Sequence, residues 1–228
     1  LQSGSPQAQT SANMPAITPA VSASVLIGGI ACFILSGFAA LLYQTAWMRQ
    51  FSVVFGTSEL AIATVLSAYM AGLAMGAAVA GRFVDRITRP VLVYGLLEAG
   101  VAISALAVPL LLALANLLYI GLLGGQPEPA DATGIGQSMF YLVVAFIVLA
   151  IPTGCMGATL PMLTKYVVCS EEQIGPRVGL LYAMNTVGAV AGTVTAGFLL
   201  LPALGLSGTV WVGVFVNGIV IVQSLIHI

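Results

Sequence analysis

Long, uninterrupted apolar segments constrain the fold of this chain more than any other feature. Each of about six segments runs for roughly 20 residues or more, which is the length a helix needs to cross the hydrocarbon layer of a bilayer. They lie near Val21–Trp47, Ser58–Ala80, Pro90–Tyr119, Gln137–Tyr166, Val178–Leu201 and Ser207–Ile228. Their hydrophobicity is continuous and does not alternate from residue to residue, which excludes a β-barrel. The sequence therefore predicts an all-α membrane protein.

The charge content supports this class and excludes others. Only 6% of the residues are charged, compared with about 25% in soluble domains. With a net charge of -1, the chain has no basic surface large enough to bind nucleic acid. Cys32, Cys155 and Cys169 lack a C-x-x-C spacing, so we interpret them as small buried hydrophobic residues with no disulfide or metal role. No catalytic, metal-ligand or phosphate-binding motif is present, so we expect neither enzymatic activity nor a cofactor.

The N-terminal segment differs in composition from the rest. Residues 1–20 are rich in Ser, Gln, Ala, Thr and Pro and contain Met14. We interpret them as a linker or an added tail that precedes a six-helix transmembrane domain over residues 21–228. No cleavable signal peptide is evident, because the first apolar segment is too long and has no basic residue before it.

Basic residues predict the orientation in the membrane. Two loops carry them, the one between the second and third segments and the one between the fourth and fifth: Arg82, Arg86, Arg89, Lys165 and Arg177. Cytoplasmic loops are enriched in Lys and Arg, so we expect this side and both termini in the cytoplasm of a bacterial inner membrane. On the opposite side we expect Arg49 to pair with Glu59 across the first turn and Glu128 and Asp131 to lie in a loop.

An internal repeat predicts the topology. Residues 116 positions apart match: Gly72, Gly76 and Gly81 correspond to Gly188, Gly192 and Gly197. Each copy, about 21–119 and about 137–228, holds three segments, so the second copy enters the membrane from the other side. This 3+3 inverted repeat is typical of secondary transporters. The alternative is a coincidence among glycines that are common in membrane helices.

The loop after the second segment carries a recognisable motif. Gly81, Asp85, Arg86 and Arg89 form G-x-x-x-D-R-x-x-R, which resembles the loop motif of the major facilitator superfamily. The family pattern has a glycine where Thr88 stands and a basic residue where Pro90 stands. The resemblance implies a gating loop in which Asp85 contacts Arg86, Arg89 or a helix N-terminus. The alternative is an ordinary cluster of basic residues on the cytoplasmic side.

Several further motifs occur together along the chain. They are Y-Q-x-x-W-x-R at Tyr43–Arg49, G-R-x-x-D-R at Gly81–Arg86, Y-G-L-L-E at Tyr94–Glu98, M-G-A-T-L-P at Met156–Pro161 and G-L-L-Y-A-M-N-T-x-G-A at Gly179–Ala189. This combination resembles the membrane half of fused spermidine synthase-like proteins. The resemblance implies a fold like one half of a major facilitator transporter, followed by a cytosolic aminopropyltransferase domain. The chain ends at Ile228, where that domain would begin.

Polar residues inside the apolar segments are the candidates for function, because charges in hydrocarbon are costly unless they face a cavity or a partner. Glu98 is predicted to bind a substrate ammonium group or a proton, with a structural hydrogen bond as the alternative. Tyr43, Gln44 and Trp47 present aromatic faces suited to cations, although Tyr and Trp also form belts at membrane interfaces. Asn185 is a second candidate ligand, and interhelical hydrogen bonding is the alternative for it and for Asn217.

Two functions follow from these residues and resemblances. The first is a half-size secondary transporter for a small cationic metabolite such as a polyamine, embedded in membrane lipid. The second is a membrane anchor or regulatory domain for an aminopropyltransferase. Because one half cannot enclose a substrate alone, we expect a homodimer. Its contact surface would be Gly72, Gly76, Gly188 and Gly192, unless these glycines pack within one bundle.

Overall fold

The computed structural model describes residues 23–123 and 135–226, and within these ranges all regular structure is helical. The elements are α1 (Ala23–Phe55), α2 (Glu59–Phe83), a 3-10 turn η1 (Val84–Arg86), α3 (Pro90–Leu123), α4 (Ile135–Val167), α5 (Glu171–Thr195), a π-helical turn η2 (Ala196–Leu200) and α6 (Leu201–Ile226). The all-α class is confirmed. The expected tail over residues 1–20, and Glu128 and Asp131, lie outside the described residues.

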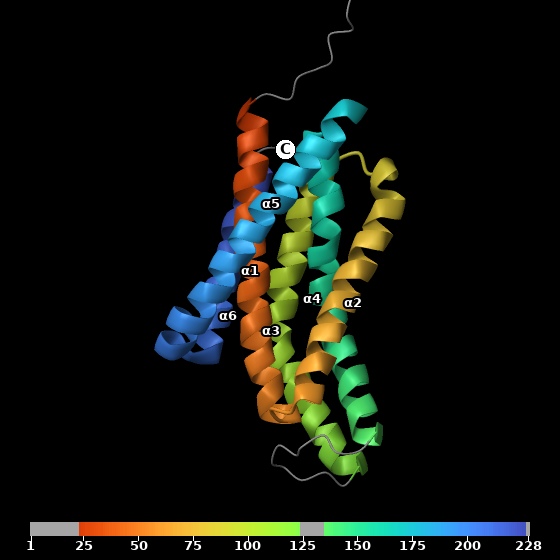
Figure 1. The fold of residues 1–228 in the computed structure, drawn as a ribbon, viewed down its shortest axis with the longest axis vertical. Helices are drawn as coiled ribbons and strands as arrows, with labels where there is room; N and C mark the ends of the chain where they lie inside the picture. The colour runs from red at the N-terminus through yellow and green to blue at the C-terminus, as the bar shows by residue number, and fades with distance from the viewer. Residues whose placement is uncertain (1–22, 124–134, 227–228) are drawn as a thin grey trace, which may run out of the picture.

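Five helical stretches are long and apolar enough to cross a membrane, by length and composition. The fifth, Glu171–Ile226, is 56 residues long and contains α5, η2 and α6. It folds back near Gly205, whose φ of 68° is a left-handed conformation that glycine adopts without strain. The two legs of this hairpin, α5 and α6, meet at the lower left of Figure 1 and correspond to the last two apolar segments expected from the sequence.

Local residues explain where the first helices end and begin. α1 ends at Phe55, directly before Gly56 with a φ of 83°, a common way to terminate a helix. Ser58 then caps α2 by accepting a hydrogen bond from the Ala61 backbone nitrogen at 3.2 Å. α3 begins with Pro90, which suits a first helical position because that position needs no backbone donor.

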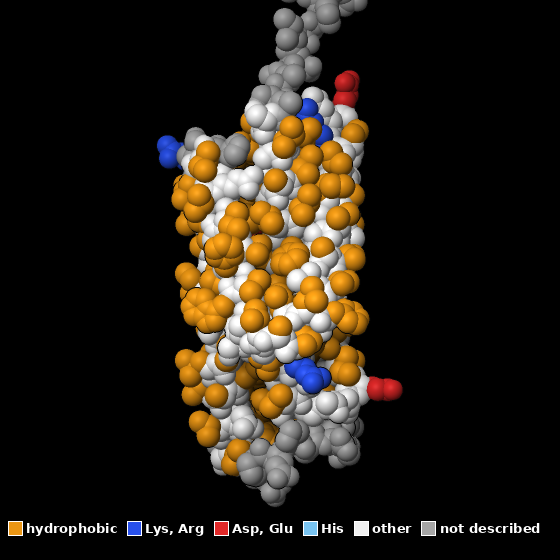
Figure 2. All heavy atoms as spheres, turned by 90° about the vertical axis from the view of Figure 1, so that its left-hand side faces the viewer, with side chains coloured by type: hydrophobic (Ala, Val, Ile, Leu, Met, Phe, Trp, Pro, Cys, Tyr) orange, Lys and Arg blue, Asp and Glu red, His pale blue; other side chains and the backbone are white. Residues whose placement is uncertain are grey.

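The helices run up and down, so the α2–α3 link, the α4–α5 link and the end of α6 lie at one end of the bundle (Figure 1). We call this the basic end, because it carries Arg82, Arg86 and Arg89. On the face that Figure 2 shows, charged side chains gather towards the two ends, and a broad band between them is apolar. This distribution fits a bundle that lies across a membrane.

Two glycines bring α2 into close contact with α4. A Cβ atom at Gly76 would collide with the backbone of Gly154, and one at Gly72 would collide with the side chain of Thr153. The absence of side chains therefore allows the two backbones to approach each other closely, as small residues do in membrane helices. This face of α2 is covered within the chain.

The same arrangement joins α5 to α1. Cβ atoms at Gly188 and Gly192 would collide with the backbone carbonyls of Ile34 and Phe38. Both glycine faces that we considered as a dimer surface thus pack inside one bundle. This is the alternative to a dimer contact given in the sequence analysis. A second copy would have to contact other faces.

Lys165 joins α4 to the end of α2. Its Nζ donates hydrogen bonds to the carbonyls of Val84 at 2.6 Å and Asp85 at 3.0 Å. The Val84 carbonyl also accepts the Ile87 backbone N–H at 3.1 Å. Both carbonyls lie at the C-terminal end of α2 and η1, where the negative end of the helix dipole favours an ammonium group.

The Asp85 side chain is exposed, lies in the first turn of η1 and forms no ion pair with Arg86 or Arg89 within the described ranges. The gating role expected for this loop stays a prediction.

The expected pair of Arg49 and Glu59 is also absent from the described part of the chain. The first helix continues past the predicted end at Trp47 to Phe55. Arg49 therefore lies inside the helix, almost two turns before the link to α2, and its side chain is exposed.

Replacing the contact glycines tests this packing. We expect Gly76→Leu and Gly192→Leu to lower the yield of folded, monodisperse protein, because overpacking of a tight contact costs about 1–3 kcal/mol or more. Gly197→Leu is the matched control, since a Cβ at Gly197 meets nothing within 4 Å. Size-exclusion profiles in detergent provide the measurement. Equal yields for all three variants would contradict the packing role.

Substitution of Lys165 tests the connection between α4 and η1. Lys165→Met removes both hydrogen bonds and should lower stability by about 1 kcal/mol, visible as a reduced melting temperature in detergent. Lys165→Arg retains donors and a positive charge, so its melting temperature should stay closer to that of the native protein. Identical melting temperatures for the Met and Arg variants would show that these hydrogen bonds contribute nothing.

Candidate functional site

Glu98 lies on α3 in the interior of the bundle. It is 1% exposed, and it is the one buried charged residue in the part of the chain that the structure describes. It lies about eight residues after the start of α3, which is roughly 12 Å along the helix from the basic end. A carboxyl group at this depth needs partners, because an isolated charge in hydrocarbon costs several kcal/mol.

Two neutral side chains supply hydrogen bonds to Glu98. The Ser36 hydroxyl on α1 donates to Oε1 at 2.6 Å, and the Asn217 amide on α6 donates to Oε2. No Lys or Arg of the described ranges forms an ion pair with Glu98. Three helices therefore converge on a carboxyl group that is solvated by neutral donors and has no positive counter-charge.

The hydrogen bonds continue from Asn217 to Tyr43. The Tyr43 hydroxyl on α1 donates to Asn217 Oδ1 at 2.9 Å. Because the amide oxygen accepts from Tyr43, its nitrogen is left to donate to Glu98. The donors thus point in one direction, from Tyr43 through Asn217 to the carboxyl group. We call Ser36, Tyr43, Glu98 and Asn217 the Glu98 cluster.

Aromatic rings extend this cluster away from the basic end. The ring of Trp47 stacks on Tyr43 with centroids 5.4 Å apart, and Tyr69 from α2 lies 6.5 Å from Trp47. All three side chains are at most 1% exposed. They are therefore core residues, and the alternative interpretation of Tyr43 and Trp47 as an interfacial belt does not fit.

Three buried polar atoms beside these rings have no hydrogen-bond partner. They are Gln44 Oε1, Trp47 Nε1 and Gln50 Oε1. They occur at every third residue along this part of α1. All three follow Tyr43 in the chain, so they lie on the side of Tyr43 that is farther from Glu98. Most buried polar atoms in folded proteins are paired, so this part of α1 retains unused capacity to bind a polar group.

Asn185 does not belong to the cluster. It lies on α5 against Gly37 of α1, where a Cβ atom at Gly37 would collide with the Asn185 backbone oxygen. The structure thus places it at a tight contact between α5 and α1, and the interhelical hydrogen bond expected as its alternative role is not seen among the described residues.

The predicted gating-loop residues lie at the basic end, apart from the Glu98 cluster. Gly81, Asp85, Arg86 and Arg89 are all exposed. The Arg86 guanidinium lies over the ring of Phe83, 5.6 Å from its centroid. Lys165, which the motif does not include, makes the contacts with the backbone there.

Sequence reasoning identified Glu98 and Tyr43 but missed two of their partners. Ser36 was not singled out, and Asn217 was expected to form an interhelical hydrogen bond, but without a named partner. One signal was available: Ser36 precedes Tyr43 by seven residues, so both lie on one face of a helix two turns apart. Nothing in the sequence pairs that face with α3 or α6.

The chemistry open to this cluster is exchange of a proton or a cation at a carboxyl group. No group of three His, Cys, Asp or Glu side chains suited to a metal ion occurs in the described ranges. Two lateral grooves, of about 450 and 460 Å³, are lined by other residues and not by Glu98.

Comparison of the chain with protein-family models, with curated proteins and with solved structures finds no match. The likeness to spermidine synthase-like fusions and to the major facilitator superfamily therefore rests on the motifs alone. The function has to be inferred from the Glu98 cluster and its surroundings.

Proposed function

We propose that this chain is a membrane transport module for a small cationic metabolite, and that Glu98 binds either a proton or the cation. The observation that carries the proposal is the fully buried Glu98 carboxyl group, which receives hydrogen bonds from neutral donors and has no basic partner in the described chain. Ionisable residues inside a membrane usually pair with one another or face a water-filled cavity. Because Glu98 has no charged partner in the described chain, we assign its neutralisation to a mobile proton or cation.

The cluster links the charge state of Glu98 to the positions of three helices. Ser36 belongs to α1 and Asn217 to α6, while Glu98 belongs to α3. When a proton or a cation neutralises the carboxyl group, the strength of both hydrogen bonds changes, since ionised acceptors form the stronger bonds. Binding at Glu98 thereby favours one arrangement of these helices over another, as coupled transport requires.

The surroundings of the cluster favour an organic amine as the cation. The faces of Tyr43, Trp47 and Tyr69 attract cations, and the unpaired oxygens of Gln44 and Gln50 accept hydrogen bonds. An ammonium group has donors and no acceptor, so it complements these oxygens. The motif resemblance to spermidine synthase-like fusions makes a polyamine the first substrate to test.

Helix packing supports an inverted repeat of major facilitator type. Gly76 on α2 meets Gly154 on α4, and Gly192 on α5 meets Phe38 on α1. The positions 116 residues from Gly76 and Gly154 are Gly192 and Phe38. The same contact thus occurs twice with the order of its partners reversed, as expected if two three-helix units are related by an inverted repeat. The proposed orientation places the basic end in the cytoplasm.

The proposal includes a homodimer, because one six-helix half leaves a substrate pathway open on one side. Since the contact glycines are covered, the partner surface would lie on the outer faces of α2 and α5, where small residues such as Ala71 and Ala183 are exposed. Small residues allow a neighbouring helix to approach closely.

A membrane anchor for an aminopropyltransferase is the second candidate. One observation favours it: both Glu98 oxygens already receive hydrogen bonds inside the bundle, as a purely structural polar group would require. In that case Glu98 fixes the positions of α1, α3 and α6, and no cation passes.

Uptake by proteoliposomes distinguishes the two functions. Purified protein should take up labelled spermidine faster than empty liposomes, and an imposed pH gradient should change the rate. Glu98→Gln should abolish the effect of the gradient and leave the folded yield nearly unchanged, because the amide can still accept from Asn217 and donate to Ser36. Glu59→Gln removes an exposed carboxyl group and is the matched control.

The outcomes separate the two candidates clearly. Uptake equal to that of empty liposomes across several polyamines would eliminate the polyamine transporter. Unchanged gradient-driven uptake by Glu98→Gln would eliminate the role of Glu98 in coupling.

Cross-linking in native membranes tests the dimer. We expect a dimeric product from the native chain, and a folded monomer from Ala71→Leu or Ala183→Leu, because a bulky side chain on an outer face obstructs a partner without entering the bundle. A product that is exclusively monomeric in native membranes would refute the dimer.

A further inference from the structure

An apolar groove of about 450 Å³ lies between α2 and α3, with α4 as its floor. Its α2 wall extends from Met75 to Phe83, a distance of about 12 Å along the helix axis. Its lining consists of Met, Gly, Val, Ala, Phe, Ile, Leu and Cys residues. Because α2 and α3 both lie across the membrane, this groove opens towards the acyl chains and not towards bulk water.

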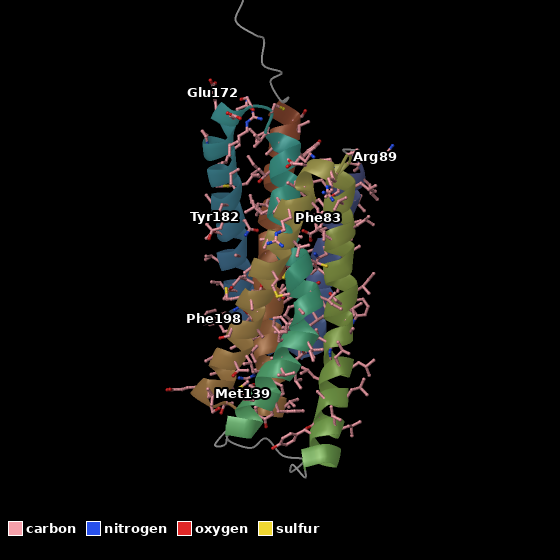
Figure 3. The ribbon with its side chains drawn as sticks, turned by 90° about the vertical axis from the view of Figure 1, so that its right-hand side faces the viewer. Phe83, Arg89, Met139, Glu172, Tyr182 and Phe198 are labelled. Carbon is pink, nitrogen blue, oxygen red and sulfur yellow. The ribbon has the colours of Figure 1, made fainter. Side chains whose placement is uncertain are left out.

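The groove ends at a concentration of positive charge. Phe83 and Ile87 line its last part, and the exposed residues Arg82, Arg86 and Arg89 lie within three positions of one or the other. The guanidinium of Arg86 lies over the Phe83 ring, 5.6 Å from its centroid, and Phe83 lines the groove, so this positive charge lies beside the end of the groove. In Figure 3, Phe83 on α2 and Arg89 beside the start of α3 lie near the upper end of the bundle.

The nearby charges leave the arginines available. Asp85 is the one acidic residue among residues 82–89, and its exposed side chain forms no ion pair in the described chain. Lys165 is bound to the carbonyls of Val84 and Asp85 and adds a further positive charge on the α4 side. This end of the groove therefore has an excess of positive charge.

We propose that the groove binds one acyl chain of a phospholipid whose anionic headgroup is held by Arg82, Arg86 and Arg89. Basic pockets between membrane helices on the cytoplasmic side are known to hold anionic headgroups. Arginine suits this role because its planar donors match the oxygens of a phosphate. This site is separate from the Glu98 cluster and does not depend on transport.

The two parts of the groove have different roles in binding. In a membrane, an acyl chain gains little from apolar surroundings, because lipid tails are as apolar as the groove. The apolar lining therefore positions the lipid through packing, and the arginines discriminate between headgroups. Two other occupants would use only part of this site. A free phosphate would bind to the arginines alone, and a second copy of the chain would pack against the apolar groove alone.

Dioleoyl phosphatidylglycerol and dioleoyl phosphatidylcholine are the probes, since they share their acyl chains and differ in headgroup charge. Native mass spectrometry of the full chain in detergent should show one tightly bound phosphatidylglycerol in preference to phosphatidylcholine. Replacing Arg82, Arg86 and Arg89 by Gln should weaken phosphatidylglycerol binding on the order of fivefold for each arginine. Arg49→Gln, at the opposite end, is the control and should leave binding unchanged.

A second pair of variants tests the groove itself. Gly154 lines the groove, and a Cβ there meets nothing within 4 Å. Gly154→Leu should fill the groove and reduce occupancy by phosphatidylglycerol. Gly121→Leu adds the same side chain at an open position on α3 outside the groove. This control variant should leave the occupancy by phosphatidylglycerol unchanged.

Four results would overturn the proposal. The first is equal binding of the two lipids by the native chain, which does not depend on any variant. The second is a preference for phosphatidylglycerol that survives removal of the arginines, and the third is unchanged occupancy in Gly154→Leu. The fourth is competition by inorganic phosphate at the same concentration as the lipid, which would indicate a free-anion site.

Discussion

Close approach of helix backbones is the constraint on which the rest of this bundle depends. In lipid, burial of apolar side chains gives helices no reason to associate, so van der Waals contact has to hold them together. Gly76 against Gly154 and Gly192 against Phe38 provide this contact. With α2 fixed on α4 and α5 fixed on α1, the remaining helices α3 and α6 complete the enclosure around Glu98.

The sequence predicted the helices and the central residue of the candidate site, because both depend on local properties. Continuous hydrophobicity marks a membrane helix, and a carboxyl group within it stands out. The surroundings of Glu98 were harder to foresee. Ser36 looks like any small residue on an apolar helix, and it becomes a donor to Glu98 only because α1 lies against α3. Trp47 resembled an interfacial residue until α1 proved to continue to Phe55.

The partners of the contact glycines and of Lys165 could not be predicted from the sequence, because these partners are backbone atoms. The spacing of the glycines indicated close packing, but it did not reveal which helix each of them meets. Lys165 suggested orientation in the membrane, whereas its Nζ in fact binds carbonyl oxygens of Val84 and Asp85. A carbonyl is present at every residue, so its use as an acceptor cannot be inferred from residue type.

The glycine contacts also determine how this bundle can deform. Sliding α2 along α4, or α5 along α1, would drive backbone atoms into one another, because there is no side chain between them to yield. Each pair of helices therefore moves as one rigid unit. In the α2–α4 pair, the hydrogen bonds of Lys165 at the basic end add a further connection. The glycine contacts lie within each pair and not between the pairs, so tilting one pair against the other meets less steric resistance than sliding the helices within a pair.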